Sequence, residues 1–334
     1  MTTQTISLAD LRRPPTPKRE SADANTNAST VGDTDRDTDG ITNTPVSAGD
    51  RASSTPPGVD PKSKDDFRLH RRFDRMGRLL GDQGMARLFS SHVMIVGIGG
   101  VGSWAAESLA RSGVGQISLV DFDLICVTNT NRQLHALKGT TGKAKVAVMA
   151  ERLRLVQPRC TVQAVRKFYN QKTSAELLAD PPDLVIDAID NLAAKTHLIA
   201  TCRARGLPLV VSGGASGRLD PTQIRESDLA KVKGDPFLAA TRKILRQRHE
   251  FPRSDALWDL PTIHSTEEPA LPQSLAYDDG AFQCVCPQGQ NSPHSCEHRS
   301  VIYGTASFVT GAFGLACAAA AVRILLNTSE RRAP

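Results

Sequence analysis

The sequence has 334 residues, a formal net charge of +6 and a pI near 9.0. Its seven cysteines are scattered and odd in number, and no secretory signal pattern is found near the N-terminus. These features exclude a disulfide-stapled secreted domain and favour a reduced, cytoplasmic protein. Residues 1–66 carry 8 basic and 11 acidic residues, whereas the remainder carries 33 and 24, so the remainder is the basic part. This imbalance favours an anionic partner such as nucleic acid.

Residues 1–66 are rich in Thr, Ser, Asp, Asn and Pro and poor in large apolar residues. Such a segment cannot bury enough apolar surface to offset the entropy of ordering, so we predict that it is disordered. A transit peptide is the functional alternative because basic residues cluster at 12–19, but the aspartate-rich run at 33–39 argues against it. Residues 67–334 are long enough for one large α/β domain.

The folded part begins with a helical pattern and then a buried strand. Phe67–Phe89 has helical periodicity, and Val93–Val96 is an apolar run of the kind that forms a parallel strand. After a glycine-rich turn, a second helical pattern covers Ser103–Arg111 and ends at Gly113. A second apolar run, Ile117–Val120, follows.

The turn between the first strand and its helix has the composition of a phosphate-binding turn. Glycines there permit a tight turn, close backbone approach to phosphate and close packing of helix on strand, and the N–H groups of the helix start attract anions. The second strand stops at Asp121, which is placed to accept hydrogen bonds from ribose hydroxyls, and Asp123 follows. A turn that serves packing alone is the alternative. The candidate glycines are Gly97, Gly99, Gly100 and Gly102.

A group of amide and cationic residues follows the second strand. Asn129 and Arg132 form an Asn-x-x-Arg pattern, and Lys145 lies in the run Gly-Lys-Ala-Lys. A nicotinamide dehydrogenase needs no such group here, whereas a triphosphate does, because Arg and Lys neutralise its oxygens and amides position them.

Alternating helices and strands complete the pattern of a doubly wound, mainly parallel Rossmann-like sheet covered by helices on both faces. One strand ends with Asp187, and Asp190 and Asn191 follow at the carboxyl edge, where such folds hold ligands. The predicted elements are a helix at Gly142–Val156, strands at Thr161–Arg166 and Asp183–Asp187, a helix at Leu192–Arg205 and a strand at Leu207–Ser212.

The last third contains a basic run, a loop-like segment and an uncharged segment. Lys231–Arg253 is strongly basic and is either a surface that faces nucleic-acid phosphates or a solvated helix face. Residues 254–300 are predicted to be loop-like, and we treat 231–300 as a basic insert. The uncharged Val301–Val322 is long enough to span a bilayer, but its small residues and the Arg323 that closes it favour a buried helix.

Cysteines in the loop-like segment suggest zinc only weakly. Cys284 and Cys286 are separated by a single residue, and His294, Cys296 and His298 follow. One-residue spacers seldom place two ligands on one tetrahedral metal, so a metal-free loop is the favoured interpretation.

These motifs in this order resemble the ATP-dependent adenylating family of ubiquitin-activating enzymes and their bacterial relatives for thiamine and molybdopterin synthesis. The runs GIGGVGSWAAESLARSGVG, VDFD, TNTNRQLHAL, GKAK and DAIDN are similar more narrowly to the tRNA threonylcarbamoyladenosine dehydratase branch. The resemblance runs from about Arg72 to about Leu326. It also implies that residues 213–224 turn into an antiparallel extension and that a C-terminal helix packs on the core.

The resemblance implies a ligase-type enzyme that binds ATP and Mg²⁺ and adenylates the carboxylate of threonylcarbamoyladenosine next to the anticodon of tRNA. Asp190 would then bind Mg²⁺, while Arg132 and Lys145 would stabilise developing charge. An N-terminal arginine, either Arg75 or Arg78, would reach the triphosphate of the partner subunit in a homodimer. Thr262 stands where a relative has cysteine, so we expect no thioester step there.

Two other functions remain open from the sequence. One is activation of the C-terminus of a sulfur-carrier protein, which usually accompanies two intact Cys-x-x-Cys zinc pairs that this sequence lacks. The other is a non-catalytic nucleotide-binding scaffold, tethered to a membrane through residues 301–322. The combination of Arg132, Lys145 and Asp190 argues against a scaffold.

Overall fold

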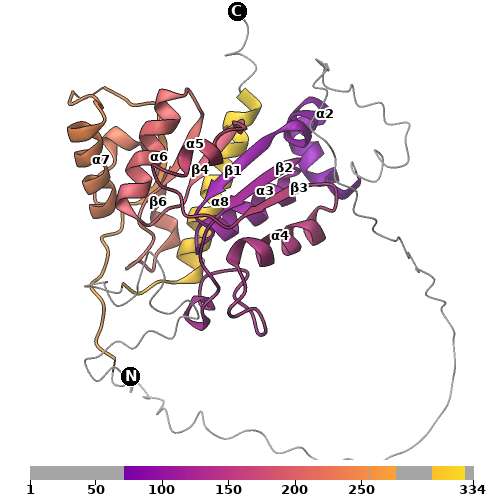
Figure 1. Ribbon diagram of the computed structural model, residues 1–334, viewed down its shortest axis with the longest axis horizontal. Coiled ribbons are helices and arrows are strands. Elements are labelled where there is room, and N and C mark those ends of the chain that lie inside the picture. Colours follow the sequence, from indigo (N-terminus) through magenta and orange to yellow (C-terminus); the bar gives the residue numbers. More distant parts are fainter. Residues whose placement is uncertain (1–70, 255, 276–302, 328–334) are drawn as a thin grey trace, which may run out of the picture. The chain divides into compact units, whose positions relative to one another are not determined.

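The computed structural model describes residues 71–254, 256–275 and 303–327 (Figure 1). The expected disorder of residues 1–66 and the cysteines at 284–296 lie outside these ranges, as does the start of the first predicted helix. That helix, α2 (Asp74–Ser90), is interrupted at Gly81, whose φ of 69° is left-handed, so the single helix predicted over Phe67–Phe89 is broken.

Seven strands in the described part of the chain form one sheet, in the order β3-β2-β1-β4-β5-β7-β6. Neighbouring strands are parallel from β3 through to β7, whereas β6 runs antiparallel to β7. The predicted mainly parallel sheet with an antiparallel extension is therefore confirmed. The strands are β1 (His92–Val96), β2 (Gln116–Val120), β3 (Thr161–Val165), β4 (Leu184–Asp187), β5 (Leu209–Ser212), β6 (Ile224–Asp228) and β7 (Pro261–Ser265).

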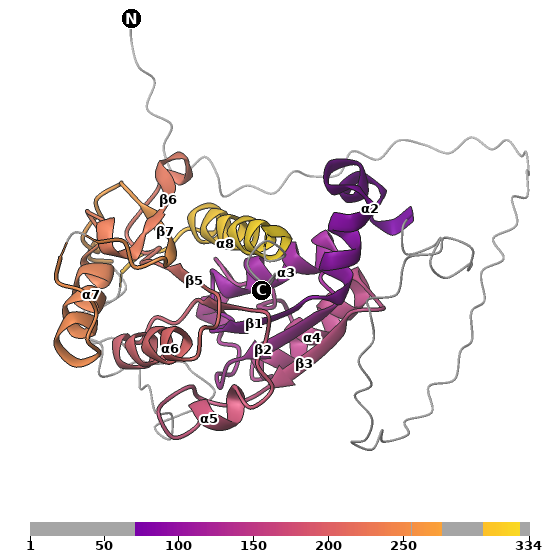
Figure 2. The same ribbon diagram turned by 90° about the horizontal axis from the view of Figure 1, so that it is seen from above.

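Helices cover both faces of this sheet (Figures 1 and 2). One face is covered by α3 (Gly102–Ser112), α4 (Lys145–Val156) and α8 (Ser307–Asn327). The other is covered by α5 (Ser174–Leu177), α6 (Leu192–Ala204) and α7 (Pro236–Arg248). Short 3₁₀ turns occupy Val127–Asn129, Pro221–Gln223 and Leu229–Lys231.

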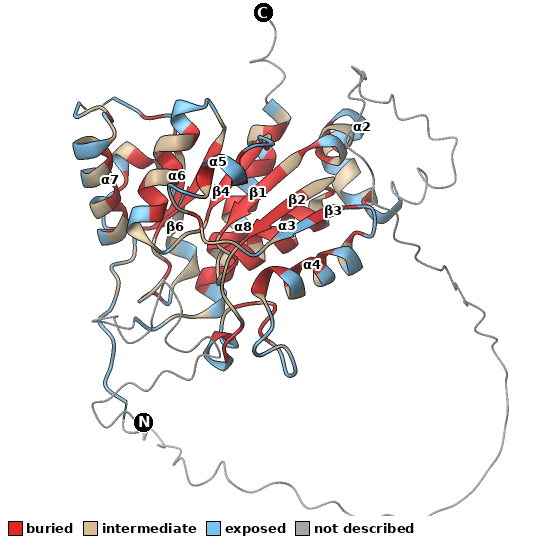
Figure 3. Ribbon diagram, viewed as in Figure 1, coloured by how far each residue is buried: buried red, intermediate tan, exposed pale blue. Residues whose placement is uncertain are grey.

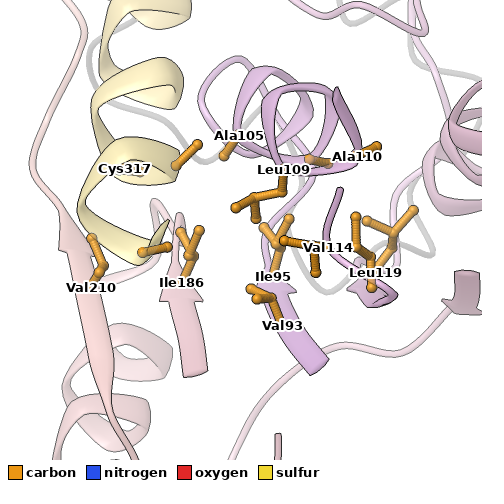
Figure 4. Close-up of a cluster of buried hydrophobic side chains, with 14 of the residues drawn as sticks. Val93, Ile95, Ala105, Leu109, Ala110, Val114, Leu119, Ile186, Val210 and Cys317 are labelled. Atoms are coloured by element: carbon orange, nitrogen blue, oxygen red, sulfur yellow. The ribbon is translucent and has the colours of Figure 1, made fainter. Parts of the chain in front are cut away.

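Strands β1, β2, β4 and β5 in the middle of the sheet are buried on both faces, as Figure 3 shows, which explains their apolar runs. The outer strands β3 and β6 are partly exposed. Alternate side chains of a strand point to opposite faces, so Ile95 packs under α3 and α8 while Met94 packs toward α6. Figure 4 shows Cys317 of α8 above the sheet near Ala105 of α3. Burying each large apolar side chain of this kind stabilises the fold by about 1.5–3 kcal/mol.

Helix α8 has the length and composition of a membrane-spanning segment, yet 61% of its most apolar window is buried within the fold. Phe313 and Cys317 are fully buried, and Gly311 and Gly314 allow the helix to lie against Trp104 of α3. The buried-helix interpretation therefore accounts for its apolar sequence. Arg323, which closes the uncharged run, lies within α8, and its exposed side chain pairs with Glu226.

Two further boundaries differ from the sequence prediction. Residues 254–300 are not wholly loop-like, because β7 lies among them and pairs with both β5 and β6. The helix predicted from Gly142 begins at Lys145, since Gly142 has a left-handed φ of 83° and its N–H donates to the carbonyl of Ile125.

The strand order places a topological switch point between β1 and β4. The chain runs outward from β1 to β2 and β3, then crosses back to β4 on the other side of β1. In such sheets the crevice outside the carboxyl ends of these strands is where ligands bind. Two of the loops expected to carry the site, after β1 and after β4, meet at this point.

Candidate active site

The glycine turn after β1 is shaped by two backbone approaches that only glycine permits. Gly97 has a φ of 94°, and a Cβ there would lie 2.6 Å from the carbonyl oxygen of Ala188 in the loop after β4. A Cβ on Gly102 would lie 1.8 Å from the carbonyl oxygen of Gly97. The turn is thus folded tightly upon itself and upon the β4 loop, and Ala188 donates its N–H to the carbonyl of Val96 at 2.9 Å.

The other two glycines face different surroundings. A Cβ on Gly99 would have only the Gln133 amide nitrogen nearby, at 3.9 Å, so open space lies over this part of the turn. A Cβ on Gly100 would lie 3.1 Å from Thr310 of α8 and 3.3 Å from Arg132. Gly99 therefore fits close approach of a ligand, whereas Gly100 packs the turn against α8 and the Arg132 loop.

A cluster of two carboxylates and one amine lies beside this turn. Asp121 accepts the Ile98 N–H at 2.7 Å and the Asp123 N–H at 2.8 Å, so both of its oxygens hold backbone in place. The Lys145 amine lies 2.6 Å from an Asp123 oxygen. Lys145 starts α4, and its backbone N–H also donates to the Asp123 carbonyl, which fixes the amine at the carboxyl edge of β2.

The electrostatics of this cluster keep Lys145 charged. Burial acts to lower the pKa of Lys145, but the negative charges of Asp121, Asp123 and Asp190 outweigh it and the pKa is raised. Burial raises the pKa of the Asp121 carboxyl, an effect that Lys145 opposes and Asp123 reinforces. The result is a desolvated ammonium ion at the edge where a phosphate would lie.

Gln133 and His135 form a buried pair next to Lys145 that the sequence analysis missed. His135 is fully buried, its Nε2 lies 3.0 Å from the Gln133 Oε1, and its Nδ1 has no hydrogen-bond partner among the described residues. Burial and the charge of Lys145 lower the pKa of His135 to about 3, so the imidazole is neutral. The signal in the sequence was the run NRQLHAL, in which both side chains follow Arg132.

Asn129 and Arg132 lie in the loop after β2, as the sequence predicted. Asn129 is buried, and its Oδ1 accepts the Cys126 N–H at 3.0 Å. The Arg132 guanidinium donates to the Thr128 carbonyl and the Asn131 side chain, each at 2.9 Å. The Trp104 indole N–H donates to the Arg132 carbonyl at 3.1 Å, which ties this loop to α3 beside the glycine turn.

The loop after β4 is anchored by a buried ion pair and presents Asp190 at its surface. Asp187 and Lys195 are both fully buried, with the Lys195 amine 2.8 Å from the carboxylate. Lys195 also donates to the Ser212 carbonyl at 3.0 Å, and Asp187 accepts the Ile189 N–H at 3.1 Å. These contacts hold the loop rigidly while Asp190 stays exposed, with its charge felt at Lys145.

Asp190 fits a magnesium ligand by the chemistry of its surroundings. Within the described residues, no group of three His, Cys, Asp or Glu side chains is placed to hold a metal by itself. Mg²⁺ is usually bound by one or two protein carboxylates together with substrate phosphates, so a single exposed carboxylate beside the triphosphate position is appropriate.

Arg75 and Arg78 do not lie at the carboxyl edge of the sheet in their own chain. Both are exposed on α2, which leads into the amino end of β1 and packs beside the C-terminal end of α8, where Arg87 donates to the Leu326 carbonyl. Figure 1 shows α2 at the end of the sheet away from the loops that carry Lys145 and Arg132. Arg78 is paired with Asp74 at 3.1 Å.

Thr262 lies inside β7 and is fully buried. Its hydroxyl donates to the Leu260 carbonyl at 2.9 Å, and its backbone is paired with Val211 and Ser227. The side chain is enclosed by the sheet.

The fold and the site together define the class of protein. A glycine turn at the switch point of a doubly wound sheet, with a buried lysine beside it, is a Rossmann-like arrangement suited to a phosphorylated ligand. The chain matches the ThiF family over residues 73–333 and belongs to that family.

Proteins that the chain strongly resembles belong to one branch of this family. The chain is 40% identical over 244 residues to tRNA threonylcarbamoyladenosine dehydratase from Haemophilus influenzae, covering 73% of this chain and 88% of the relative. It is 40% identical over 262 residues to the Escherichia coli dehydratase of the same name, covering 78% and 96%. The crystal structure of tRNA N6-threonylcarbamoyladenosine dehydratase from E. coli in complex with ATP is similar, with a TM-score of 0.68 at 37% identity and coverage of 79% and 97%.

Proposed function

We propose that this protein catalyses the ATP-dependent dehydration of N6-threonylcarbamoyladenosine in tRNA, through adenylation of the carboxylate of the modified base. The observation that carries the proposal is the convergence of the glycine turn, Lys145 and Asp190 at one edge of the sheet. Two relatives named for this dehydration match over 88% and 96% of their length. An E. coli protein of that name has been crystallised with ATP and with AMP.

ATP fits the described residues in a definite way. The open space over Gly99 accepts the phosphates close to the backbone, and the N-terminus of α3 points its N–H groups toward them. Lys145 and Arg132 would neutralise phosphate oxygens, and Asn129 would orient the loop that carries Arg132. Asp121 would lie beside the ribose, and its oxygens already accept two backbone N–H groups.

Asp190 would hold Mg²⁺, which supplies neutralisation of the triphosphate when it is bound. The rigid Asp187–Lys195 pair beneath Asp190 keeps that carboxylate at one place on the edge. Lys145 does not depend on the metal, because Asp123 fixes its amine at 2.6 Å.

The reaction then has two bond-exchange steps. A carboxylate oxygen of threonylcarbamoyladenosine attacks the α-phosphorus of ATP, the bond to pyrophosphate breaks, and an acyl adenylate forms. A nucleophile within the modified base attacks the acyl carbon and loses its proton, and AMP leaves with the former carboxylate oxygen. The balance is loss of one water from the nucleoside, with Lys145 and Arg132 stabilising the negative charge that develops at phosphorus.

The ring closure needs no nucleophile from the enzyme. Thr262 is enclosed in β7, and the described cysteines, Cys126, Cys160, Cys202 and Cys317, are all buried. Burial raises the pKa of Cys202 and Cys317 to about 12 each, so neither is a thiolate at neutral pH.

We include a homodimer in this proposal. The carboxyl edge of the sheet that carries Gly99, Lys145 and Asp190 is called the nucleotide edge. Arg75 and Arg78 lie away from the nucleotide edge of their own chain, so either one reaches a triphosphate only from a second copy. Mixing an Asp190→Asn variant with an Arg75→Ala/Arg78→Ala variant tests this. Each is expected to be inactive alone, and mixed dimers are expected to regain activity, because one intact site is assembled across the two chains.

The test of the function is mass spectrometry of tRNA nucleosides after incubation with the protein, ATP and Mg²⁺. Threonylcarbamoyladenosine is expected to convert to a product lighter by one water, with equimolar AMP. Protein carrying Asp190→Asn is the matched control. Persistence of the starting nucleoside with folded wild-type protein that binds ATP would refute the proposed function.

A sulfur-carrier protein is the second candidate substrate. Molybdopterin-synthase adenylyltransferase from E. coli is 36% identical to this chain over 137 residues, which cover 41% of this chain and 54% of the relative. This similarity spans a smaller share of both proteins than the similarity to the dehydratases. AMP release stimulated by the C-terminus of a carrier protein, and not by tRNA, would favour this alternative.

A further inference from the structure

Helix α7 carries a basic hollow that the proposed adenylation chemistry does not use. The hollow has a volume of about 330 Å³ and is lined by side chains of α7 and by Arg253. Helix α7 itself lies beside α6 and distant from α4 (Figures 1 and 2). Its charged lining consists entirely of cations. The lining residues are Ala239, Arg242, Lys243, Arg246, Gln247 and Arg253.

The arginines of the hollow are held in place by neighbouring groups. The Arg246 guanidinium lies 5.2 Å from the centre of the Trp258 ring and donates to the Pro252 carbonyl at 3.3 Å. Arg242 donates to the Leu229 carbonyl at 3.4 Å. Trp258 is itself buried and packs edge-on against Phe251, whose ring centre is 4.7 Å away. The guanidinium groups are thus pre-organised, which reduces the entropy lost when they bind an anion.

The hollow concentrates positive charge without carboxylate partners. In the parts of the chain that the structure describes, no ion pair joins Arg242, Lys243, Arg246 or Arg253 to an acidic side chain. Burial, together with the like charge of Arg246, lowers the pKa of Arg242. An anion in the hollow would relieve this repulsion, whereas each buried cation of the nucleotide edge already has a carboxylate.

We propose that the α7 hollow is a docking site for the phosphate backbone of the RNA substrate. Arg242 and Arg246 are four residues apart on one face of the helix, so their guanidinium groups form a row along the helix axis. A row of fixed forked donors suits successive phosphates of a chain better than one small anion. The inference rests on the proposed function, because it takes tRNA as the substrate.

The position of the hollow defines what it does. Asp235 caps the start of α7 and accepts the Gly214 N–H at the carboxyl end of β5, and the helix then runs away from that edge. Arg246 is ten residues beyond the first residue of the helix, or about 15 Å at 1.5 Å per residue. The hollow therefore holds RNA at a distance from the reacting carboxylate, and it sets affinity for tRNA rather than the rate of adenylation.

The experiment compares two triple variants with the same loss of charge. The hollow variant is Arg242→Gln/Lys243→Gln/Arg246→Gln, and the control is Arg154→Gln/Arg159→Gln/Lys172→Gln, all exposed residues on the α4 side or the loop after β3. Binding of a tRNA transcript is measured without ATP over a range of salt concentrations. The hollow variant is expected to bind at least about 10-fold more weakly, with the slope of log K against log salt smaller by about 2, since each lost phosphate contact removes about 0.7–0.9.

Three further readouts make the result decisive. The KM for tRNA is expected to rise while the kcat and the affinity for ATP stay at wild-type values. A Lys243→Gln/Arg253→Gln variant changes only exposed side chains, so it reports on the hollow if the triple variant has a lowered melting temperature. Inorganic phosphate and chloride at equal ionic strength are expected to displace RNA equally.

The inference is overturned if the hollow variants bind RNA as tightly as the control. It is also overturned if inorganic phosphate displaces RNA selectively from wild type and not from the hollow variant, because the hollow would then be a small-anion site. Failure of the proposed function has a different signature, in which wild type binds tRNA through the hollow and leaves its threonylcarbamoyladenosine unchanged.

Discussion

The nucleotide edge and the α7 hollow both concentrate charge, and they do so in opposite ways. At the nucleotide edge, Lys145 and Lys195 are buried and each lies within 3 Å of a carboxylate, at 2.6 and 2.8 Å. In the hollow, Arg242 and Arg246 are only half-buried, and neighbouring carbonyls and an aromatic ring hold them instead of acidic groups.

This difference separates positioning from recognition. A buried cation without a partner costs several kcal/mol, so the edge must neutralise its charges internally, and in return its geometry is fixed. Cations at a surface remain hydrated, so they need no internal partner and are available to bind an external anion. The edge is thus suited to chemistry at one phosphorus atom, and the hollow to holding a large polyanion. Three predictions test this comparison.

The largest expected effect comes from breaking the buried pair at the edge. Lys195→Met leaves the Asp187 carboxylate buried and uncompensated, so we expect a loss of about 3–5 kcal/mol of unfolding free energy. Urea denaturation measures it. Asp187→Asn combined with Lys195→Met is expected to recover a large part of the loss, because the isolated charge is removed. If the single and double variants are equally destabilised, the pair does not act as described.

The next largest effect is a loss of catalysis with no change in stability. Asp190 is exposed, so Asp190→Asn is expected to leave the melting temperature unchanged while lowering AMP formation by about 10²–10³-fold, the usual loss for a single group that stabilises a transition state. Arg132→Ala is expected to act similarly. Thr262→Val, which keeps the buried shape, is the control with near-normal turnover. An Asp190→Asn variant with normal turnover, or a Thr262→Val variant without any, would contradict these roles.

The smallest effect is a pH dependence of stability at the edge. The pKa of His135 is about 3 in the folded protein against 6.5 for an unperturbed histidine. Between these values only the unfolded chain binds the proton, so stability is present above pH 6.5 and is lost as the pH falls. The expected loss is about 2 kcal/mol between pH 7 and pH 5. His135→Asn is expected to flatten this slope, and an unchanged slope would show that another group causes it.

The strands and the glycine turn could be predicted because local pattern determines them. Apolar runs such as Ile117–Val120 are buried on both faces, and Gly97 and Gly102 occupy positions where a Cβ would collide with backbone. Strand β7 was not predicted, because the run Pro261–Ser265 contains one large apolar residue. Its burial depends on hydrogen bonds made by the surrounding fold, such as that between His264 and Ser227 at 3.0 Å.

Sequence motifs indicated which side chains the fold brings to the carboxyl edge of the sheet, with the exception of Arg75 and Arg78, but they did not indicate the electrostatics of that edge. Lys195 was not singled out from the sequence, because its pairing with Asp187 becomes visible only when β4 and α6 are packed together. The basic run at 231–253 was evident, but pattern alone does not show that Trp258 holds the Arg246 side chain. Long-range contacts of this kind have no signature in sequence spacing.

The most direct test of the central claim follows the carboxylate oxygen of the substrate. tRNA carrying threonylcarbamoyladenosine with a heavy-oxygen label in its carboxylate is incubated with the protein, ATP and Mg²⁺, and the released AMP is analysed by mass spectrometry. Attack on the α-phosphorus at the nucleotide edge predicts that each AMP carries one carboxylate oxygen and that label is absent from pyrophosphate. Label found in inorganic phosphate or in water, with unlabelled AMP, would contradict adenylation as the activating step.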